Sequence, residues 1–361
     1  MERKDVISAP QLFSLLFLCN VIIGITYNLP LAKSTNMWNH ILSAVITFFV
    51  NIVLILPILK LHKISPTMTI ADHCAVSFPR LGKVFLAAYA LYYLFACCYV
   101  LSLFNVFVKD VVNPEISLFL LTLCVILAAS YAACKGIEGL ARACSVILFL
   151  ICAAVLFIVF ALLPQVDPLN FSPLIYNDFA DTLNGTIYLV SLLFFVPLAG
   201  VLVPFAKGSI KKALFATSAS VYLLFIFVVV LVTGALGDYL KTQTFPIYTA
   251  ASVAEIGVFR RLDAIYLGVF TSGLFITVAM FLFAFFLVAK KIFGAQHSKN
   301  IIFFGDLLVL VFSLVVPAFK GVAHFFFDAN FIVVPTILTA LVIPLLVLAR
   351  HKFLLKRGAQ R

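Results

Sequence analysis

The feature that most constrains this chain is a succession of apolar runs, each about 20 residues long and almost free of charge. At about 1.5 Å per residue, a helix of that length crosses the hydrocarbon core of a bilayer. Hydrophobic residues fill 64% of the 361 positions and charged residues 11%, so a soluble core could not bury this much apolar surface. The sequence therefore predicts an all-α polytopic membrane protein, with residues 1–361 forming a single integral membrane domain.

We expect about ten transmembrane helices, because charge, proline or glycine bounds each apolar run. The expected spans are 10–31, 37–59, 84–108, 115–134, 140–163, 185–206, 212–236, 263–289, 301–319 and 331–349. An even number of spans places both termini on one side, and most of the 25 Lys and Arg residues fall on that side. The positive-inside rule makes this side cytoplasmic. The net charge of +11 is therefore interpreted as a topology signal, and no nucleic-acid partner is expected.

Five spans in each half mean that the second half crosses the membrane in the opposite sense from the first, as in an inverted repeat. The predicted repeats cover residues 10–163 and 185–349, followed by a short cytoplasmic tail at 350–361. The first and sixth spans then correspond, and each contains a helix-weakening residue, Gly24 or Pro197. We expect both helices to be discontinuous near these residues. The alternative that Gly and Pro merely kink the two helices stays open.

Two broken helices in corresponding positions indicate a ligand site near the middle of the membrane. Freed amides at half-helix N-termini favour a carboxylate and freed carbonyls favour an ammonium group, so a small zwitterion suits both. The candidate ligand-binding residues on the first and sixth spans are Asn20, Gly24, Ile25, Thr26, Phe195, Val196, Pro197, Leu198 and Gly200. The third and eighth spans add Tyr92, Tyr93, Ala96, Val100, Thr271, Ser272 and Thr277. The tyrosines also fit ordinary aromatic packing, and the hydroxyls also fit hydrogen bonds to their own helix.

Charged and catalytic groups are scarce in the apolar runs. No Asp, Glu, Lys or Arg lies at mid-depth between the first and eighth spans, which disfavours a carboxylate-driven proton pump. Asp306 in the ninth span is the exception, and we interpret it as interfacial. The His, Cys and Ser residues form no pattern typical of a metal site, a cofactor site or a nucleophile with its base. An enzyme is not expected.

Several stretches, in order along residues 7–294, resemble a known family. They are Ile7–Leu12, Ile23–Gly24, Leu29–Pro30, Trp38, Tyr131–Arg142, Phe194–Leu198, Phe245–Pro246 and Arg261–Asp263. In this order they resemble the B subunit of the bacterial spore germinant receptors, with Lys135–Arg142 and Arg261–Asp263 the most specific.

The resemblance implies the LeuT-like five-plus-five inverted repeat of the amino acid–polyamine–organocation superfamily. It further implies a sensor of a small germinant, often an amino acid, that works with A and C subunits in the spore inner membrane or cell membrane of an endospore-forming bacterium. The resemblance also implies that Gly24, Val100 and Leu198 form part of the wall of the ligand pocket. Where many superfamily members have Gly-x-Gly, this chain has Gly24-Ile25-Thr26. An amino-acid permease of the same fold is the alternative function, and a membrane scaffold with a vestigial pocket is a third.

Lys and Arg usually concentrate in cytoplasmic loops, so basic residues near the predicted outer end of the eighth span are unexpected. Arg260 and Arg261 lie there beside Glu255 and Asp263. These carboxylates could simply neutralise the arginines as surface pairs. Alternatively, Arg261 and Asp263 form a partner-docking or gating corner, which is the interpretation we favour because Arg-Leu-Asp resembles the family.

Overall fold

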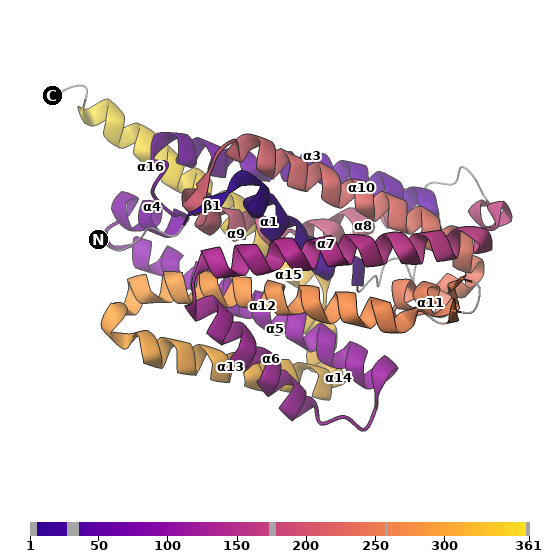
Figure 1. The fold of residues 1–361 in the computed structure, drawn as a ribbon. Coiled ribbons are helices and arrows are strands. Elements are labelled where there is room, and N and C mark those ends of the chain that lie inside the picture. Colours follow the sequence, from indigo (N-terminus) through magenta and orange to yellow (C-terminus); the bar gives the residue numbers. More distant parts are fainter. Residues whose placement is uncertain (1–5, 27–35, 173–177, 257–258, 261, 359–361) are drawn as a thin grey trace.

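The structure is a computed structural model that describes residues 6–26, 36–172, 178–256, 259–260 and 262–358. Its long helices run side by side in one bundle (Figure 1). In the described residues, eight helices are long and apolar enough to cross a membrane, and Ala9–Ile23 and Leu118–Cys134 are shorter apolar helices. The prediction of an all-α polytopic membrane protein is confirmed. The two shorter helices coincide with the first and fourth predicted spans.

The elements follow the chain in this order. The helices are α1 (Ala9–Thr26), α3 (Met37–Ile64), α4 (Ile70–Ser77), α5 (Gly82–Phe107), α6 (Leu118–Cys134), α7 (Ile137–Leu162), α8 (Phe179–Ser191), α9 (Phe195–Leu202), α10 (Ile210–Leu236), α11 (Pro246–Val253), α12 (Asp263–Phe293), α13 (Ser298–Ala318), α14 (Lys320–Phe326), α15 (Ala329–Ile337) and α16 (Ile343–Gly358). The two-residue strands are β1 (Ile7–Ser8), β2 (Ala206–Lys207), β3 (Glu255–Ile256) and β4 (Phe259–Arg260). Short π-helical segments, Val108–Val112 and Leu338–Val342, extend α5 and join α15 to α16.

The centre of the bundle is formed by α1, α8 and α9. The most apolar window of the α8–α9 region is 89% buried, whereas that of α7 is only 22% buried, so α7 presents most of its surface to lipid. Helix α1 packs against α7, α9, α10 and α12, and its Leu12, Leu15 and Leu16 are fully buried. The segments predicted to carry the ligand site are therefore the most enclosed part of the protein.

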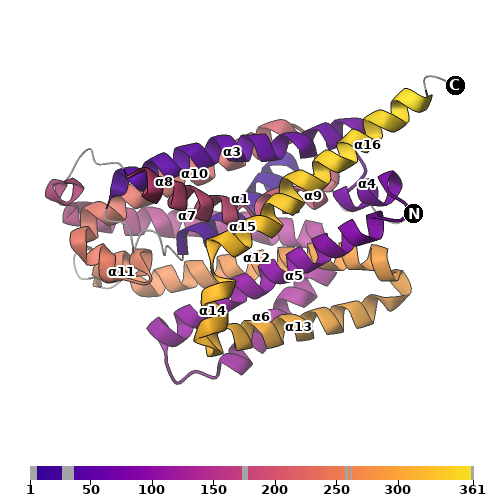
Figure 2. The ribbon, with the colours of Figure 1, turned by 180° about the vertical axis from the view of Figure 1, so that it is seen from behind.

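Two short helices of eight residues cover opposite ends of the bundle. Helix α4 lies at the end where β1 and α16 lie, and α11 lies at the other end (Figures 1 and 2). Helix α4 begins with a capping box in which Thr69 and Asp72 satisfy each other's backbone N–H groups. Helix α11 begins at Pro246, whose fixed φ suits the first helical position. At the α4 end, β1 pairs in parallel with β2 through Ile7↔Ala206.

The sixth predicted span is discontinuous, as expected, but it is not broken at Pro197. Helix α8 ends at Ser191 and α9 begins at Phe195. Pro197 is the third residue of α9, where a backbone N–H has no intrahelical partner in any case. The missing N–H therefore costs little there, and the break at 192–194 lies one turn earlier.

The described part of the first span has no break at Gly24 itself, and the break expected near it stays a prediction. Helix α1 continues through Gly24 to Thr26. One glycine inside a helix costs only about 1 kcal/mol, less than the several kcal/mol needed to unpair backbone groups in an apolar interior. Residues 27–35, with Leu29-Pro30, lie outside the described residues.

Candidate functional site

Side chains from two other helices donate hydrogen bonds to backbone carbonyls beside the α8–α9 interruption. The Thr336 hydroxyl, from α15, donates to the carbonyl of Ser191 at 3.2 Å. The Tyr93 hydroxyl, from α5, donates to the carbonyl of Pro197 at 2.8 Å. The N-terminus of α9 has no side-chain cap, so the positive end of its dipole faces the interruption. The Ser191 carbonyl thus has a protein partner, and the N–H groups of Phe194 and Val196 donate to the carbonyls of Leu192 and Leu193 at 2.8 and 3.2 Å.

An aromatic cluster fills the interruption. The Phe194 ring lies 5.9 Å from Tyr92, 5.4 Å from Tyr99 and 6.1 Å from Phe281, measured between ring centroids. These separations are typical of favourable aromatic pairs. The Tyr92 hydroxyl is also within 3.3 Å of Thr336 Oγ1. The predicted tyrosines Tyr92 and Tyr93 therefore pack in this cluster and tie α5 to the broken helix, and their role in ligand binding stays a prediction.

Helices α1 and α12 meet closely through small side chains. A Cβ atom on Gly273 would collide with Ile22 of α1, so glycine is required for this approach. The Cys19 thiol of α1 lies beside Thr277, and the Thr277 hydroxyl donates to the carbonyl of Gly273 at 2.8 Å. Thr277 therefore bonds to its own helix while contacting α1.

A small cavity lies between α1, α8 and α10, beside the interruption. It is lined by Asn20, Val21, Leu189, Leu192, Val221, Tyr222 and Phe225, and its water-accessible volume is about 20 Å³. That is room for one water molecule. The Oδ1 atom of Asn20 and the hydroxyl of Tyr222 are both buried there without a hydrogen-bond partner. Unpartnered buried polar atoms are costly, so this wall is poised to accept a polar ligand or a water.

The structure brings together many of the predicted site residues and separates others. Tyr92, Tyr93, Ala96, Val100, Phe195, Val196, Pro197, Leu198 and Thr277 are all buried where α5, α9 and α12 meet. Gly200 lies farther along α9, where an added Cβ would meet Ile70 of α4 at 3.3 Å. Thr271 and Ser272 are half-buried, and the Ser272 hydroxyl donates to the carbonyl of Gly268 at 2.7 Å.

The predicted partner or gating corner is described only in part. Asp263 is the first residue of α12, and its Oδ2 accepts a hydrogen bond from the Tyr248 hydroxyl of α11 at 3.0 Å. Arg261 lies outside the described residues, as do the side chains of Gly24, Ile25 and Thr26. Asp263 therefore links α11 to α12, and its relation to Arg261 stays a prediction.

Sequence reasoning missed Tyr222, Phe194 and Thr336. Tyr222 follows the hydroxyl residues Thr217, Ser218 and Ser220 on α10, so the sequence did not single it out. Phe194 is one of 39 phenylalanines and carries no signal of its own. The role of Thr336 depends on α15 packing against α8, which only the tertiary structure reveals.

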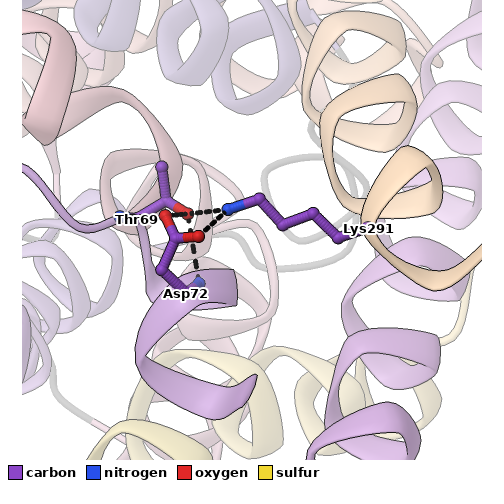
Figure 3. Close-up of polar contacts among 3 residues, drawn as sticks. All are labelled: Thr69, Asp72 and Lys291. Atoms are coloured by element: carbon purple, nitrogen blue, oxygen red, sulfur yellow. Dashed lines mark hydrogen bonds and ion pairs between the residues drawn. The ribbon is translucent and has the colours of Figure 1, made fainter. Parts of the chain in front are cut away.

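A polar anchor joins α4 to the end of α12. Lys291 Nζ donates to Thr69 Oγ1 at 2.9 Å and forms an ion pair with Asp72 (Figure 3). Burial alone would raise the pKa of Asp72, but hydrogen bonds from Lys291 and Thr69 and the lysine charge outweigh it, so the pKa is lowered. The same two residues form the α4 capping box. The anchor therefore fixes α4 over the end of α9.

A histidine pair joins α4 to α16. His73 Nδ1 lies 3.4 Å from His351 Nε2. Burial, followed by the neighbouring charge of His351, lowers the pKa of His73 to about 4. His73 is therefore neutral in the folded protein near neutral pH.

The apolar bundle and the interrupted central helix define a polytopic integral membrane protein with an enclosed polar site. A family model described as spore germination protein matches residues 6–320. The chain therefore belongs to the spore germination protein family, which confirms the resemblance found in its sequence. A comparison with curated proteins finds no match.

Proposed function

We propose that this protein is the germinant-sensing subunit of a spore germinant receptor and binds a small ligand, such as an amino acid, within the membrane. The observation that carries the proposal is the interrupted α8–α9 helix beside a cavity with two unpartnered polar atoms, on Asn20 and Tyr222. The family adds the link to spore germination. Signalling would pass to A and C subunits in the spore inner membrane or cell membrane.

The ten-span inverted repeat is part of this proposal. Helices α4 and α11 support it, since each has eight residues and they cover opposite ends of the bundle. In the proposed arrangement α1 corresponds to α8–α9, α3 to α10, α5 to α12 and α6 to α13. Both termini would then be cytoplasmic, on the α4 side.

The chemistry of the cavity suits a zwitterion. Asn20 Oδ1 can accept a hydrogen bond from an ammonium group, and the Tyr222 hydroxyl can donate one to a carboxylate. Because the cavity holds only about one water molecule, ligand entry requires side chains such as Leu192 and Phe225 to move. Binding would thus select a wider state of the site, and that population shift is the proposed signal.

An amino-acid permease is the second candidate, and Asp306 is the observation that favours it. Asp306, on α13, is half-buried, and its Oδ1 is buried without a hydrogen-bond partner. Ser130 of the neighbouring helix α6 lies near it. A buried carboxyl in a span is typical of proton-coupled transport.

The test uses the purified chain and a panel of amino acids, sugars and nucleosides, with thermal unfolding as the readout. A ligand at 100 times its Kd should stabilise the protein by about 2.7 kcal/mol. Asn20→Leu should abolish this stabilisation, whereas Asn330→Leu, a matched change of an exposed asparagine, should keep it. Stabilisation of both variants to the wild-type level would refute the site. Ligand uptake into proteoliposomes that is lost in Asp306→Asn would favour the permease.

A further inference from the structure

A second and much larger cavity lies on the other side of α1. Its walls come from α1, α7, α10, α11 and α12, and its water-accessible volume is about 400 Å³. The lining is almost wholly apolar, with residues such as Phe17, Ile151, Val155, Val228 and Phe270. A dry void of this size would forfeit the dispersion contacts of every lining side chain, and water gains few partners in an apolar space. The cavity therefore calls for an apolar occupant.

The position of the cavity identifies where that occupant comes from. Lining residues on α7 extend from Leu148 to Leu162, a length of about 21 Å at 1.5 Å per residue. This is longer than one leaflet, which is half of a hydrocarbon core about 30 Å thick, so the cavity can hold an acyl chain along its whole length. Leu156 and Cys152 line the cavity and are exposed on the outer surface of the bundle. The space therefore opens sideways, into the hydrocarbon of the membrane.

One polar group lies at the α11 end of the cavity. Tyr266 lines the cavity, its side chain is only 7% exposed, and its hydroxyl has no hydrogen-bond partner. Tyr266 is in the first turn of α12, which begins at Asp263, and therefore lies near one end of this long apolar helix. A buried hydroxyl without a partner costs free energy, and an ester carbonyl at the start of an acyl chain would accept its hydrogen bond.

We propose that this cavity is a binding site for one acyl chain of a glycerolipid from the leaflet on the α11 side, with Tyr266 donating a hydrogen bond to the ester carbonyl. The chain enters between α7 and α10 and reaches Val21 and Ile22 of α1. Val21 also lines the small Asn20 cavity. The bound chain therefore supports α1 on the side opposite the proposed germinant site, and the inference does not depend on that site.

The experiment places the purified chain in phosphatidylglycerol and phosphatidylethanolamine nanodiscs with a fraction of phospholipid that carries a diazirine within its acyl chain. Photolysis and peptide mapping then locate the adducts. Ile22 is only 5% exposed, so bulk lipid cannot reach it. Adducts on α1 around Ile22 are expected. Adducts confined to outward residues such as Phe149 would overturn the proposal.

Variants distinguish labelling by lipid inside the cavity from labelling by lipid on the outer surface of the bundle. Val155→Trp and Val228→Trp, from opposite walls, should each reduce the α1 adducts to background. Phe149→Trp, on the lipid-exposed face of the same α7 helix, should leave them unchanged. Tyr266→Phe should weaken retention of ester lipid about fivefold, the value of one neutral hydrogen bond, and should not change retention of an ether-linked analogue. Persistent α1 adducts in both tryptophan variants, at wild-type folding yield, would refute the site.

Discussion

The anchor between Lys291 and α4 offers the most direct quantitative test of the structure. In Lys291→Met the side chain keeps its length and loses its charge, so the ion pair with Asp72 and the hydrogen bond to Thr69 are removed. The side chains of Lys291 and Asp72 are 29% and 37% exposed, so solvent screening limits the pair to about 1 kcal/mol. The capping box of α4 remains, because it needs only Thr69 and Asp72.

The expected loss for Lys291→Met is therefore about 1 kcal/mol, or a decrease of about 1–2 °C in Tm for a chain of this length. Asp72→Ala should cost about 2 kcal/mol, because it removes the ion pair and half of the capping box. The double variant should cost about 0.5–1 kcal/mol less than the sum of the two single variants, since the two residues interact directly. Thermal unfolding of the purified chain measures all three.

Lys290→Met is the matched control, because Lys290 is also in the last turn of α12 and is exposed. It should change stability by less than about 0.5 kcal/mol. Equal losses in the two lysine variants, or additivity of Asp72→Ala with Lys291→Met, would refute the anchor.

The pH dependence of the stability difference between wild type and Lys291→Met tests the ion pair with Asp72 a second time. The pKa of Asp72 is lowered in the folded state, so its stabilisation is complete above the ordinary aspartate pKa of about 3.9 and is lost as pH falls through the lower, folded value. His73, with its pKa lowered to about 4, loses stability over a higher window, from about pH 6.5 downward. Lys291 also lowers the pKa of His73, so the difference between wild type and Lys291→Met should decrease slightly from about pH 6.5 downward and should shrink further below about pH 4, where Asp72 is protonated. A difference that does not shrink below about pH 4 would contradict the assignment to Asp72.

The remaining predictions concern the broken helix and its neighbours. Gly24→Leu should abolish ligand-dependent stabilisation while the protein still folds, and a normal ligand response would contradict the mid-membrane site. Pro197→Ala should change stability by less than about 1 kcal/mol, because Pro197 lies in the first turn of α9; a large stabilisation would place the break at Pro197 after all. Phe194→Ala should cost about 3–5 kcal/mol by unfolding assay, since it empties the aromatic cluster. Gly185→Leu should destabilise α8 against α3 by more than about 2 kcal/mol, because even a Cβ would lie 2.6 Å from Ser43 Oγ; a neutral result would contradict that packing.

Local chemistry determined what the sequence could predict. The apolar runs identified the spans because a bilayer requires about 20 apolar residues for each helix. Pro197 correctly indicated an interrupted sixth span but not its position, since a proline is equally compatible with the first turn of a new helix. The interruption itself occurs at Leu192–Phe194, whose residues have no helix-breaking character.

Tertiary packing determined what the sequence could not predict. The unpartnered hydroxyl of Tyr222 and the side-chain oxygen Oδ1 of Asn20 line the same cavity only because α1 and α10 pack together. Thr336 reaches the broken helix from a span that sequence reasoning left out of the site. Such pairings depend on helix rotation and contact, and a single sequence does not encode them in a readable pattern.

The short ladder between β1 and β2 has a mechanical consequence. It joins the residues directly before α1 to those directly after α9, and Glu138 of α7 accepts a further hydrogen bond from the Val6 N–H at 3.0 Å. The ladder therefore holds α1 and α9 together at this end of the bundle. Any separation of the two helices must therefore be greatest at their far ends, near Gly24 and the α8–α9 interruption. In the proposed function, a ligand no larger than an amino acid would therefore separate α1 and α9 at the ends that lie farthest from the β1–β2 ladder and from α4.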